Sequence, residues 1–288
     1  MDTLRPVDRH TRNQLNTYLG KIENALEADV LTISSPMVLS LEYKVKYAIE
    51  LFQERKSRIA VILDTLGGTI EVVERLVSVI RHHYNEVDFL IPDRAMSAGT
   101  VFVMAGDRIF MNYFSCLGPI DPQIVKNDEL VPAMSYLNQY QRLSEKAEAG
   151  QLNMADITLL NKLDLGELYQ FEQARELSHD LLINWLSTYK FKNWETHSST
   201  GKPVTDEDKK QRAEDIAKVL SDNERWHSHG RMISRDTLTL RSEGIRLKIE
   251  EIEDHPNILS ALNDYVGLLN DYIQREKHIS FVHTREYF

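Results

Sequence analysis

Residues 58–111 alternate short apolar runs with amphipathic segments, and this alternation limits the fold more than any other feature of the chain. Residues 58–63 (RIAVIL) and 87–91 (VDFLI) are almost continuously apolar, which is typical of strands buried on both faces of a parallel sheet. Residues 69–84 between them carry apolar side chains at helical spacing, and residues 108–111 (RIFM) form a further apolar run after a short helix. This order predicts an α/β domain with parallel strand pairing.

The sequence around these elements divides the chain into three parts. Residues 1–130 contain the predicted α/β core. Residues 131–195 are rich in predicted helix and include an apolar stripe from Leu168 to Tyr189, which would pack on the core or on another subunit. We therefore treat this part as a candidate oligomerisation element. Residues 196–288 begin with a polar loop and are expected to complete the core and end in a helical tail, which gives a helix-rich C-terminal extension.

Charge and composition limit the classes of partner. The 34 basic and 44 acidic residues give a formal net charge of −10, so the chain offers no electrostatic footprint for nucleic acid or an anionic membrane. Cys116 is the single cysteine, which excludes an internal disulfide and suits a reducing compartment. The first thirty residues lack the apolar core of a signal peptide, and no apolar run is long enough to span a bilayer. We expect a soluble, cytoplasmic protein.

Gly67 and Gly68 follow the first buried strand, at a point where sites form in open α/β sheets. Paired glycines permit positive φ angles and let a ligand approach the backbone closely. Their N–H groups, at the start of a helix, can point at a developing negative charge. A tight turn without any further role is the alternative interpretation of the same pair.

Ser97 stands in a second loop of this kind, between Met96 and Ala98, directly after the second predicted strand. Its hydroxyl would lie beside the N–H of Ala98, and a carbonyl attacked by Ser97 could place its oxygen between that N–H and the N–H of Gly68. The alternative is that Ser97 is a helix N-cap, a role that serine fills often.

Three segments together resemble a known family. Residues 64–68 (DTLGG), 96–100 (MSAGT) and 117–123 (LGPIDPQ) occur in the order and at the spacing of the serine dehydrogenase proteinase family, which is related to signal peptide peptidase A. The resemblance is densest over residues 58–125. It implies the Clp-protease/crotonase-like superfold, which is built from repeated β-β-α units.

The resemblance also implies site residues. Ser97 would be the nucleophile, and Gly68 and Ala98 would supply the oxyanion N–H groups. The strand after the Gly-Gly helix, residues 87–91, could hold an extended peptide by backbone pairing. Leu66 departs from the family, whose members usually carry proline there, and we expect this residue to change the shape of the loop.

The sequence offers several candidates for the general base that Ser97 requires. The Clp protease has a histidine soon after its nucleophile, whereas this chain has no histidine between His83 and His179. His229, with His227 as its neighbour, lies in a segment that resembles the late part of Clp proteases. Imidazole is the side chain used most often as a general base. A structural histidine is the alternative, and a metal site at this pair would lack its other ligands.

A lysine is the other kind of base, as in the Ser-Lys dyad of signal peptide peptidase A relatives. Lys126, Lys146 and Lys162 follow Ser97 in the chain, and Lys162 has the most apolar sequence neighbours. A lysine acts as a base only when burial lowers its pKa. Most lysines are instead solvated charges on the surface.

We therefore expect a serine peptidase that forms an acyl-enzyme on Ser97 and cleaves a peptide or protein substrate. A crotonase-like enzyme that acts on an acyl thioester is the first alternative, because the same oxyanion hole could hold an enolate. A catalytically inactive scaffold of the same fold is the second. No cofactor or metal is expected. The resemblance implies a homo-oligomer, because relatives form rings or dimers.

Overall fold

A six-stranded sheet forms the centre of the molecule. The computed structural model describes residues 5–120, 123–126, 129–240 and 242–288. The strand order is β10-β5-β3-β2-β1-β11, and neighbours are parallel except for β11, which runs antiparallel to β1. The strands are β1 (Asp29–Ser34), β2 (Arg58–Asp64), β3 (Glu86–Ile91), β5 (Arg108–Met111), β10 (Glu250–Glu251) and β11 (Phe281–His283).

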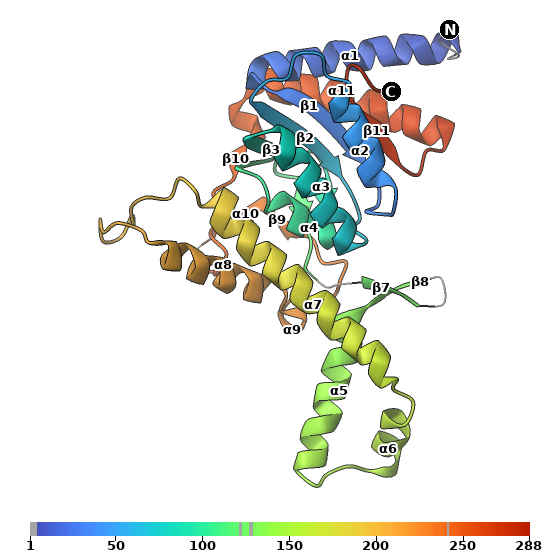
Figure 1. Cartoon of the computed structure of the whole chain (residues 1–288), viewed down its shortest axis with the longest axis vertical. Helices are drawn as coiled ribbons and strands as arrows, with labels where there is room; N and C mark the ends of the chain where they lie inside the picture. Colours follow the sequence, from blue (N-terminus) through green and yellow to red (C-terminus); the bar gives the residue numbers. More distant parts are fainter. Residues whose placement is uncertain (1–4, 121–122, 127–128, 241) are drawn as a thin grey trace.

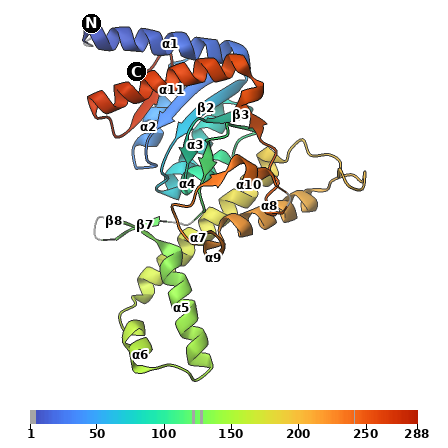
Figure 2. The same cartoon turned by 180° about the vertical axis from the view of Figure 1, so that it is seen from behind.

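Helices cover both faces of this sheet (Figures 1 and 2). The long helices α1 (Pro6–Leu26) and α11 (Pro256–Glu276) lie side by side on one face. The opposite face packs against α2 (Leu41–Glu50), α3 (Ile70–His83) and α4 (Ala98–Val103). Helix α7 (Leu165–Trp185) packs on α3 and α4 with its second half, and α8 (Asp206–Leu220) packs on α7. None of the helices in the described part of the chain is long and apolar enough to cross a membrane.

Strand β2 shows why the apolar runs form this core. Ala60 and Ile62 pack in the cluster under α1 and α11, whereas Ile59, Val61 and Leu63 pack in the cluster on the other face. Successive side chains of a strand point to opposite faces, so a strand covered on both sides must be apolar throughout. The prediction of buried parallel strands at 58–63, 87–91 and 108–111 is confirmed.

A second, small sheet is built from the segments that follow the main strands. It contains β4 (Arg94–Ala95), β6 (Cys116–Leu117) and β9 (Ile233–Ser234). Strand β3 leads into β4, and β5 leads into β6, so each unit contributes one strand to each sheet. An isolated bridge between Thr65 and Ala95 joins the loop after β2 to the same sheet. This is the repeated β-β-α arrangement that we expected.

The segment from β7 to the first half of α7 forms an arm that projects away from the sheet (Figure 1). The hairpin of β7 (Gln123–Lys126) and β8 (Glu129–Pro132) leads into α5 (Ala133–Glu148), α6 (Met154–Leu160) and the first half of α7. The remaining short elements are the π-helical turn η1 (Leu186–Lys190), α9 (Asn223–Trp226), α10 (Arg235–Thr239) and η2 (Ile252–Asp254).

The apolar stripe of the middle part is divided between two clusters. Leu168 and Phe171 pack with Leu137 on α5, within the arm. Leu181 and Trp185, farther along α7, pack in the main core. The stripe is therefore packing surface within this chain along most of its length.

The prediction that the strand after the Gly-Gly helix holds a peptide is wrong. This strand is β3, and it is paired with β2 on one edge and with β5 on the other. Both rows of backbone hydrogen-bonding groups are therefore used within the sheet, and no edge remains for an added strand.

A buried histidine joins both termini to the sheet. His283 in β11 is fully buried, and its Nδ1 lies 2.8 Å from the hydroxyl of Tyr265 on α11. Its Nε2 lies 3.1 Å from Oδ1 of Asn16 on α1, and Tyr265 donates a hydrogen bond of 2.7 Å to Thr32 on β1. Burial, with a smaller contribution from Arg12, lowers the pKa of His283 to about 3, so the ring is neutral in the folded protein.

The neutral ring predicts that the protein loses stability in mild acid. The unfolded chain takes up a proton on His283 below a pKa of about 6.5, whereas the folded protein does so only near 3. The free energy of unfolding should therefore fall as the pH drops below about 6.5, by up to about 1.4 kcal/mol per pH unit from this residue. Urea unfolding at pH 7.5, 6 and 5 measures the slope.

The variant His283→Gln should be about 1–3 kcal/mol less stable at pH 7.5, since it disturbs a buried hydrogen-bond network. It should also show a smaller loss between pH 7.5 and 5 than the wild type. The exposed His10 on α1 provides the control, and His10→Gln should keep the wild-type slope. An unchanged slope in His283→Gln would contradict the argument.

Candidate active site

The two loops singled out in the sequence meet in the structure. A Cβ atom added to Gly67 would lie 2.8 Å from Cβ of Ser97 and 2.7 Å from the carbonyl oxygen of Met96, closer than real Cβ atoms approach. Gly67 also has φ = 95°, which L side chains rarely adopt. Glycine is therefore required here both by the backbone and by the contact with Ser97.

Gly68 continues the same segment, which is held by Met37. The N–H of Met37 donates to the carbonyl of Gly67, and the N–H of Thr69 donates to the carbonyl of Met37, both at 2.8 Å. These two hydrogen bonds form a parallel bridge between Met37 and Gly68, and they do not use the N–H of Gly68.

Ser97 has the backbone of a sharp turn between β4 and α4. Its φ of 52° and ψ of −119° are unusual for a residue with a side chain, and the residue is 2% exposed. Such strain is found where surrounding structure forces a side chain into a functional position. Ser97 stands at the N-cap position of α4, but its side chain makes no capping hydrogen bond to the helix, so capping does not explain the serine there. The N–H of Ala98 follows directly, in the first turn of α4.

Thr100 holds this turn in place, and the sequence analysis missed it. The residue is fully buried one helical turn after Ser97. Its hydroxyl lies 2.8 Å from the carbonyl oxygen of Ala95 and 2.9 Å from that of Gly118, and it accepts a hydrogen bond of 3.0 Å from the N–H of Gly118. One side chain thus links α4, β4 and the loop after β6. A threonine in an otherwise small and apolar helix was the signal that could have identified it.

Three charged side chains, Asp64, Asp93 and Arg94, lie close to this turn. Nε of Arg94 is 3.7 Å from Oδ1 of Asp64, at the end of β2, and 3.9 Å from Oδ2 of Asp93. Burial raises the pKa of the Asp64 carboxyl, and Arg94 opposes that rise. Cys116 is paired with Arg94 in the small sheet, and burial raises the pKa of its thiol, which keeps it protonated and poorly nucleophilic.

His229 precedes β9, the third strand of the small sheet. The residue is half-buried in the loop between α9 and β9. Strand β9 runs antiparallel to β6, and β6 runs parallel to β4, so the residues before Ile233 lie alongside the residues that follow β4. His227 is exposed and has φ = 60°, two residues farther from the sheet.

The candidate lysines lie elsewhere. Lys146 is near the end of α5, on the arm, where Nζ is 3.1 Å from Oδ1 of Asp156 and the side chain is about half exposed. Lys162 is exposed just after α6, also on the arm. Lys126 belongs to β7, and only its backbone is described. Asp121 of the third motif lies outside the described residues.

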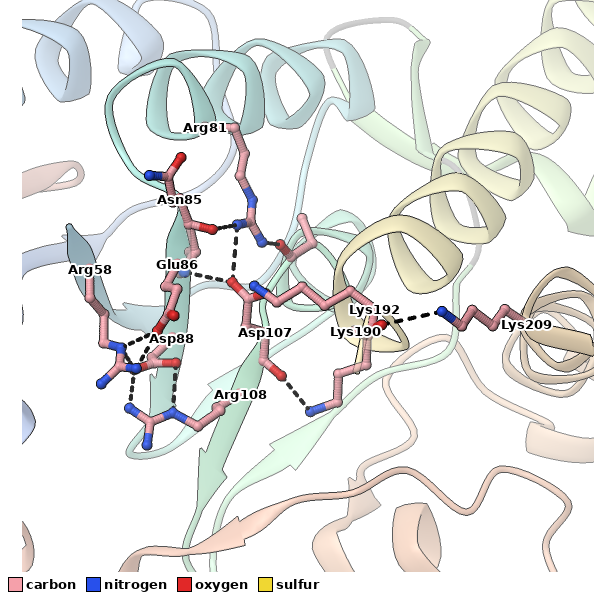
Figure 3. A network of polar contacts seen from close by, with 12 residues as sticks. Arg58, Arg81, Asn85, Glu86, Asp88, Asp107, Arg108, Lys190, Lys192 and Lys209 are labelled. Atoms are coloured by element: carbon pink, nitrogen blue, oxygen red, sulfur yellow. Dashed lines mark hydrogen bonds and ion pairs between the residues drawn. The ribbon is translucent and has the colours of Figure 1, made fainter. Parts of the chain in front are cut away.

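The lysine whose pKa burial lowers strongly is one that the sequence did not indicate. Lys190, in η1, has a pKa lowered to about 8 by burial, and its Nζ donates to the carbonyl of Asp107 at 3.3 Å. Figure 3 shows it beside Lys192, which pairs with the Asp107 carboxylate. Asp107 precedes β5, whereas Ser97 follows the end of β3, and these two strands are parallel, so Lys190 lies at the opposite end of the strands from Ser97.

Metal ligation receives no support from the side chains that can be placed. Within residues 5–120, 123–126, 129–240 and 242–288, no group of three or more histidine, cysteine, aspartate and glutamate residues could hold a metal ion.

Comparisons with curated proteins give distant relatives. The uncharacterized protein MJ1495 of Methanocaldococcus jannaschii is 30% identical over 140 residues, which are 46% of this chain and 47% of that protein. The uncharacterized protein MJ0137 of the same organism is 32% identical over 129 residues, or 42% of this chain and 44% of that protein. The chain thus spans less than half the length of these relatives.

Among solved structures, two of the 1510-N membrane-bound stomatin-specific protease are similar. Both have a TM-score of 0.32 and cover 42% of this chain. One is 19% identical and is covered over 63% of its chain. The other, in complex with a substrate peptide, is 22% identical and is covered over 59%.

A family model gives the decisive match. The model described as ClpP-like SDH-type serine proteinase matches residues 32–210, which is more than half of the chain and includes both site loops. The predicted family resemblance and the Clp-protease/crotonase-like fold class are thereby confirmed. The chain belongs to the family of ClpP-like SDH-type serine proteinases.

Proposed function

We propose that the protein is a serine peptidase that cleaves peptide or protein substrates through an acyl-enzyme on Ser97. The observation that carries the proposal is the contact between the Gly67 backbone and Ser97, with Ser97 held in a strained turn. A serine that serves only as a helix cap needs neither the strain nor the glycine contact. Membership of a serine proteinase family supports the same reaction class.

In the proposed acylation step, Oγ of Ser97 attacks the carbonyl carbon of the scissile amide. The hydroxyl proton passes to a general base, and a tetrahedral intermediate with a negatively charged oxygen forms. Collapse of the intermediate breaks the C–N bond, and the protonated base returns the proton to the leaving amine. Water then attacks the ester by the same route and releases the acid, which restores the Ser97 hydroxyl.

The N–H groups of Gly68 and Ala98 are the proposed donors to the oxyanion. The bridge to Met37 uses the carbonyl of Gly67 and the N–H of Thr69 and leaves the N–H of Gly68 out of these two hydrogen bonds, which supports this role. The Ala98 nitrogen lies 3.3 Å from the position of a Cβ added to Gly67, so the two donors belong to loops in direct contact. Preorganised backbone N–H groups stabilise a developing oxyanion without reorganisation during the reaction.

We propose His229 as the general base. Its loop leads into β9, and the pairing of β9 with β6 and of β6 with β4 supports this role, as does the half-buried state of His229, whereas His227 is exposed. Lys146 is held by Asp156 and Lys162 is exposed, both on the arm, so neither has the desolvated surroundings that a base lysine needs. His229 is also the candidate whose side chain works as a base without such surroundings.

A fluorophosphonate probe tests the nucleophile. The wild-type protein should be labelled on Ser97, and Ser97→Ala should abolish labelling while leaving the thermal unfolding midpoint within a few degrees of the wild type. Peptide mapping by mass spectrometry identifies the modified residue.

Ser115, which is also buried near the end of a main strand, provides the control, and Ser115→Ala should still be labelled. If the folded wild type stays unlabelled while a reference serine hydrolase reacts, the peptidase proposal fails and the scaffold alternative gains support.

Paired histidine variants test the base. His229→Ala should lower the rate of peptide cleavage by about 10²–10⁴-fold, the usual contribution of a positioned general base. The exposed His227→Ala should change it less than threefold, as expected for a surface substitution. Cleavage of a casein-derived peptide mixture, followed by mass spectrometry, measures both. Equal losses in the two variants would count against His229 as the base.

Thr100 is expected to act as a positioning residue. Thr100→Val keeps the shape of the side chain but leaves the buried N–H of Gly118 without its acceptor, which should cost about 1–3 kcal/mol of stability. The rate of fluorophosphonate labelling should fall about tenfold or more because Ser97 is no longer held in its turn. Thr100→Ser, which retains the hydroxyl, should recover most of the labelling rate. Slow labelling of both variants would show that the hydroxyl of Thr100 does not position Ser97.

A further inference from the structure

A groove between α7 and α8 is separate from the candidate active site. It has a volume of about 750 Å³, and residues of the second half of α7, of η1 and of the first half of α8 line it. The loop of residues 191–205 reverses the chain between the two helices, so α8 runs back along α7 (Figure 1). The volume is typical of sites that bind small molecules, and none of the residues that line the groove belongs to the loops around Ser97.

One end of this groove has an excess of positive charge. Lys209 and Lys210 lie near the start of α8, and Nζ of Lys209 donates to the carbonyl oxygen of Lys192 at 3.2 Å (Figure 3). This contact places the start of α8 beside the residues that follow η1. The ammonium group of Lys192 pairs with Asp107, so two lysines remain against one acid, Asp206, at this end. We call it the lysine end.

The other end of the groove is acidic. Asp180 on α7 and Glu214 on α8 line it. Asp180 is eight residues before Thr188, so it lies about 12 Å along α7 from the part of the helix next to the lysine end. Glu214 is four residues after Lys210, about 6 Å along α8 in the same direction. Neither carboxylate forms an ion pair with another described residue. We call this the acidic end.

Between the two ends, the groove offers hydrogen-bonding groups that suit a peptide backbone. The Ser187 hydroxyl donates to the carbonyl oxygen of Ile183 at 2.7 Å, and the Thr188 hydroxyl donates to Oδ1 of Asn184 at 3.3 Å. Both hydroxyl oxygens can still accept N–H groups, and the amide nitrogen of Asn184 can donate to a carbonyl. A peptide group carries one donor and one acceptor, which matches this set.

We propose that the groove is a binding site for a short peptide with free termini, whose carboxylate lies at the lysine end and whose ammonium group lies at the acidic end. An extended chain spans at most about 3.3–3.6 Å per residue, so three residues reach roughly 10 Å, which matches the separation of the charges. Both termini then gain partners of opposite sign, and Asp180 and Glu214 gain the cation that they lack. The binding does not depend on Ser97, and if the proposed peptidase function holds, such peptides are among its products.

The charge pattern selects against other small ligands. A free amino acid carries both charges next to a single carbon atom and cannot reach both ends of the groove. A phosphate-bearing ligand would satisfy the lysine end but would bring negative charge toward Asp180 and Glu214. An extended peptide of six residues is about 20 Å long and would place one terminus beyond the groove.

Calorimetry with the Ser97→Ala protein tests the site, because peptides then stay intact. Trialanine should bind. N-acetyl-trialanine and trialanine amide each lack one terminal charge and should bind about tenfold or more weakly, as expected for the loss of a hydrogen-bonded charge. Hexaalanine should also bind about tenfold or more weakly, since its two termini cannot reach both ends of the groove together.

Paired charge variants of the same protein locate the peptide. Lys209→Gln/Lys210→Gln should bind trialanine about tenfold or more weakly and should no longer distinguish it from trialanine amide. Asp180→Asn/Glu214→Gln should instead lose the distinction between trialanine and N-acetyl-trialanine. Misfolding would weaken the binding of all peptides together and cannot produce these selective losses. Lys218→Gln, which alters an exposed residue of α8 outside the groove, is the matched control and should keep all the affinities.

Three results would overturn the site: no binding of trialanine, equal affinities for the free and capped peptides, or trialanine binding that both charge variants leave unchanged. Fluorophosphonate labelling of the wild type decides the peptidase function separately. A labelled wild type without trialanine binding to Ser97→Ala retains the peptidase and removes the groove site. An unlabelled wild type with selective trialanine binding retains the groove site and removes the peptidase.

Discussion

The close approach of Gly67 to Ser97 is the constraint on which the rest of the site depends. It brings together two loops that are separated by α3 and β3 in the sequence, and it can form only because position 67 has no side chain. The main sheet sets the two loops side by side, since β2 and β3 are adjacent parallel strands. The small sheet then fixes the positions of the two loops along the strands, because the Thr65–Ala95 bridge joins their segments just before Gly67 and Ser97 come into contact. Burial of the apolar strands on both faces supplies the stability that holds Ser97 in its strained turn.

Much of this fold could be predicted from the sequence, for a physical reason. Strands β2, β3 and β5 are covered on both faces, so their apolar runs are nearly continuous and need no comparison with other proteins to be recognised. The small sheet could not be predicted in the same way. Its strands β4, β6 and β9 are two residues long and carry no periodic pattern, and the pairing of β6 with β9 joins segments more than a hundred residues apart.

The residues of the site also differ in how far the sequence alone could identify them. Ser97 and Gly68 follow strands, so their loops could be located from local patterns. The role of Thr100 depends on Gly118, which comes close only after the chain has passed through β5 and β6. The lysines show a further limit of the sequence, because Lys190 was not among the candidates. The desolvation of a lysine depends on tertiary packing, which the apolar sequence neighbours of Lys162 did not indicate. Lys190 in η1 is half-buried, its Nζ donates to the carbonyl of Asp107, and desolvation lowers its pKa.

The packing of Met96 over Gly118 has a consequence for how such a site can change over generations. Clp proteases carry a histidine soon after the nucleophile, in the region that here reads Cys116-Leu117-Gly118-Pro119. In this chain the space above Gly118 is filled, since any Cβ there would overlap the Met96 side chain. Positions 96 and 118 are therefore coupled, and a histidine at 118 is sterically compatible only after the side chain at 96 has become small or has moved. An exchange at one of these two positions is therefore expected to change which side chains the other accepts.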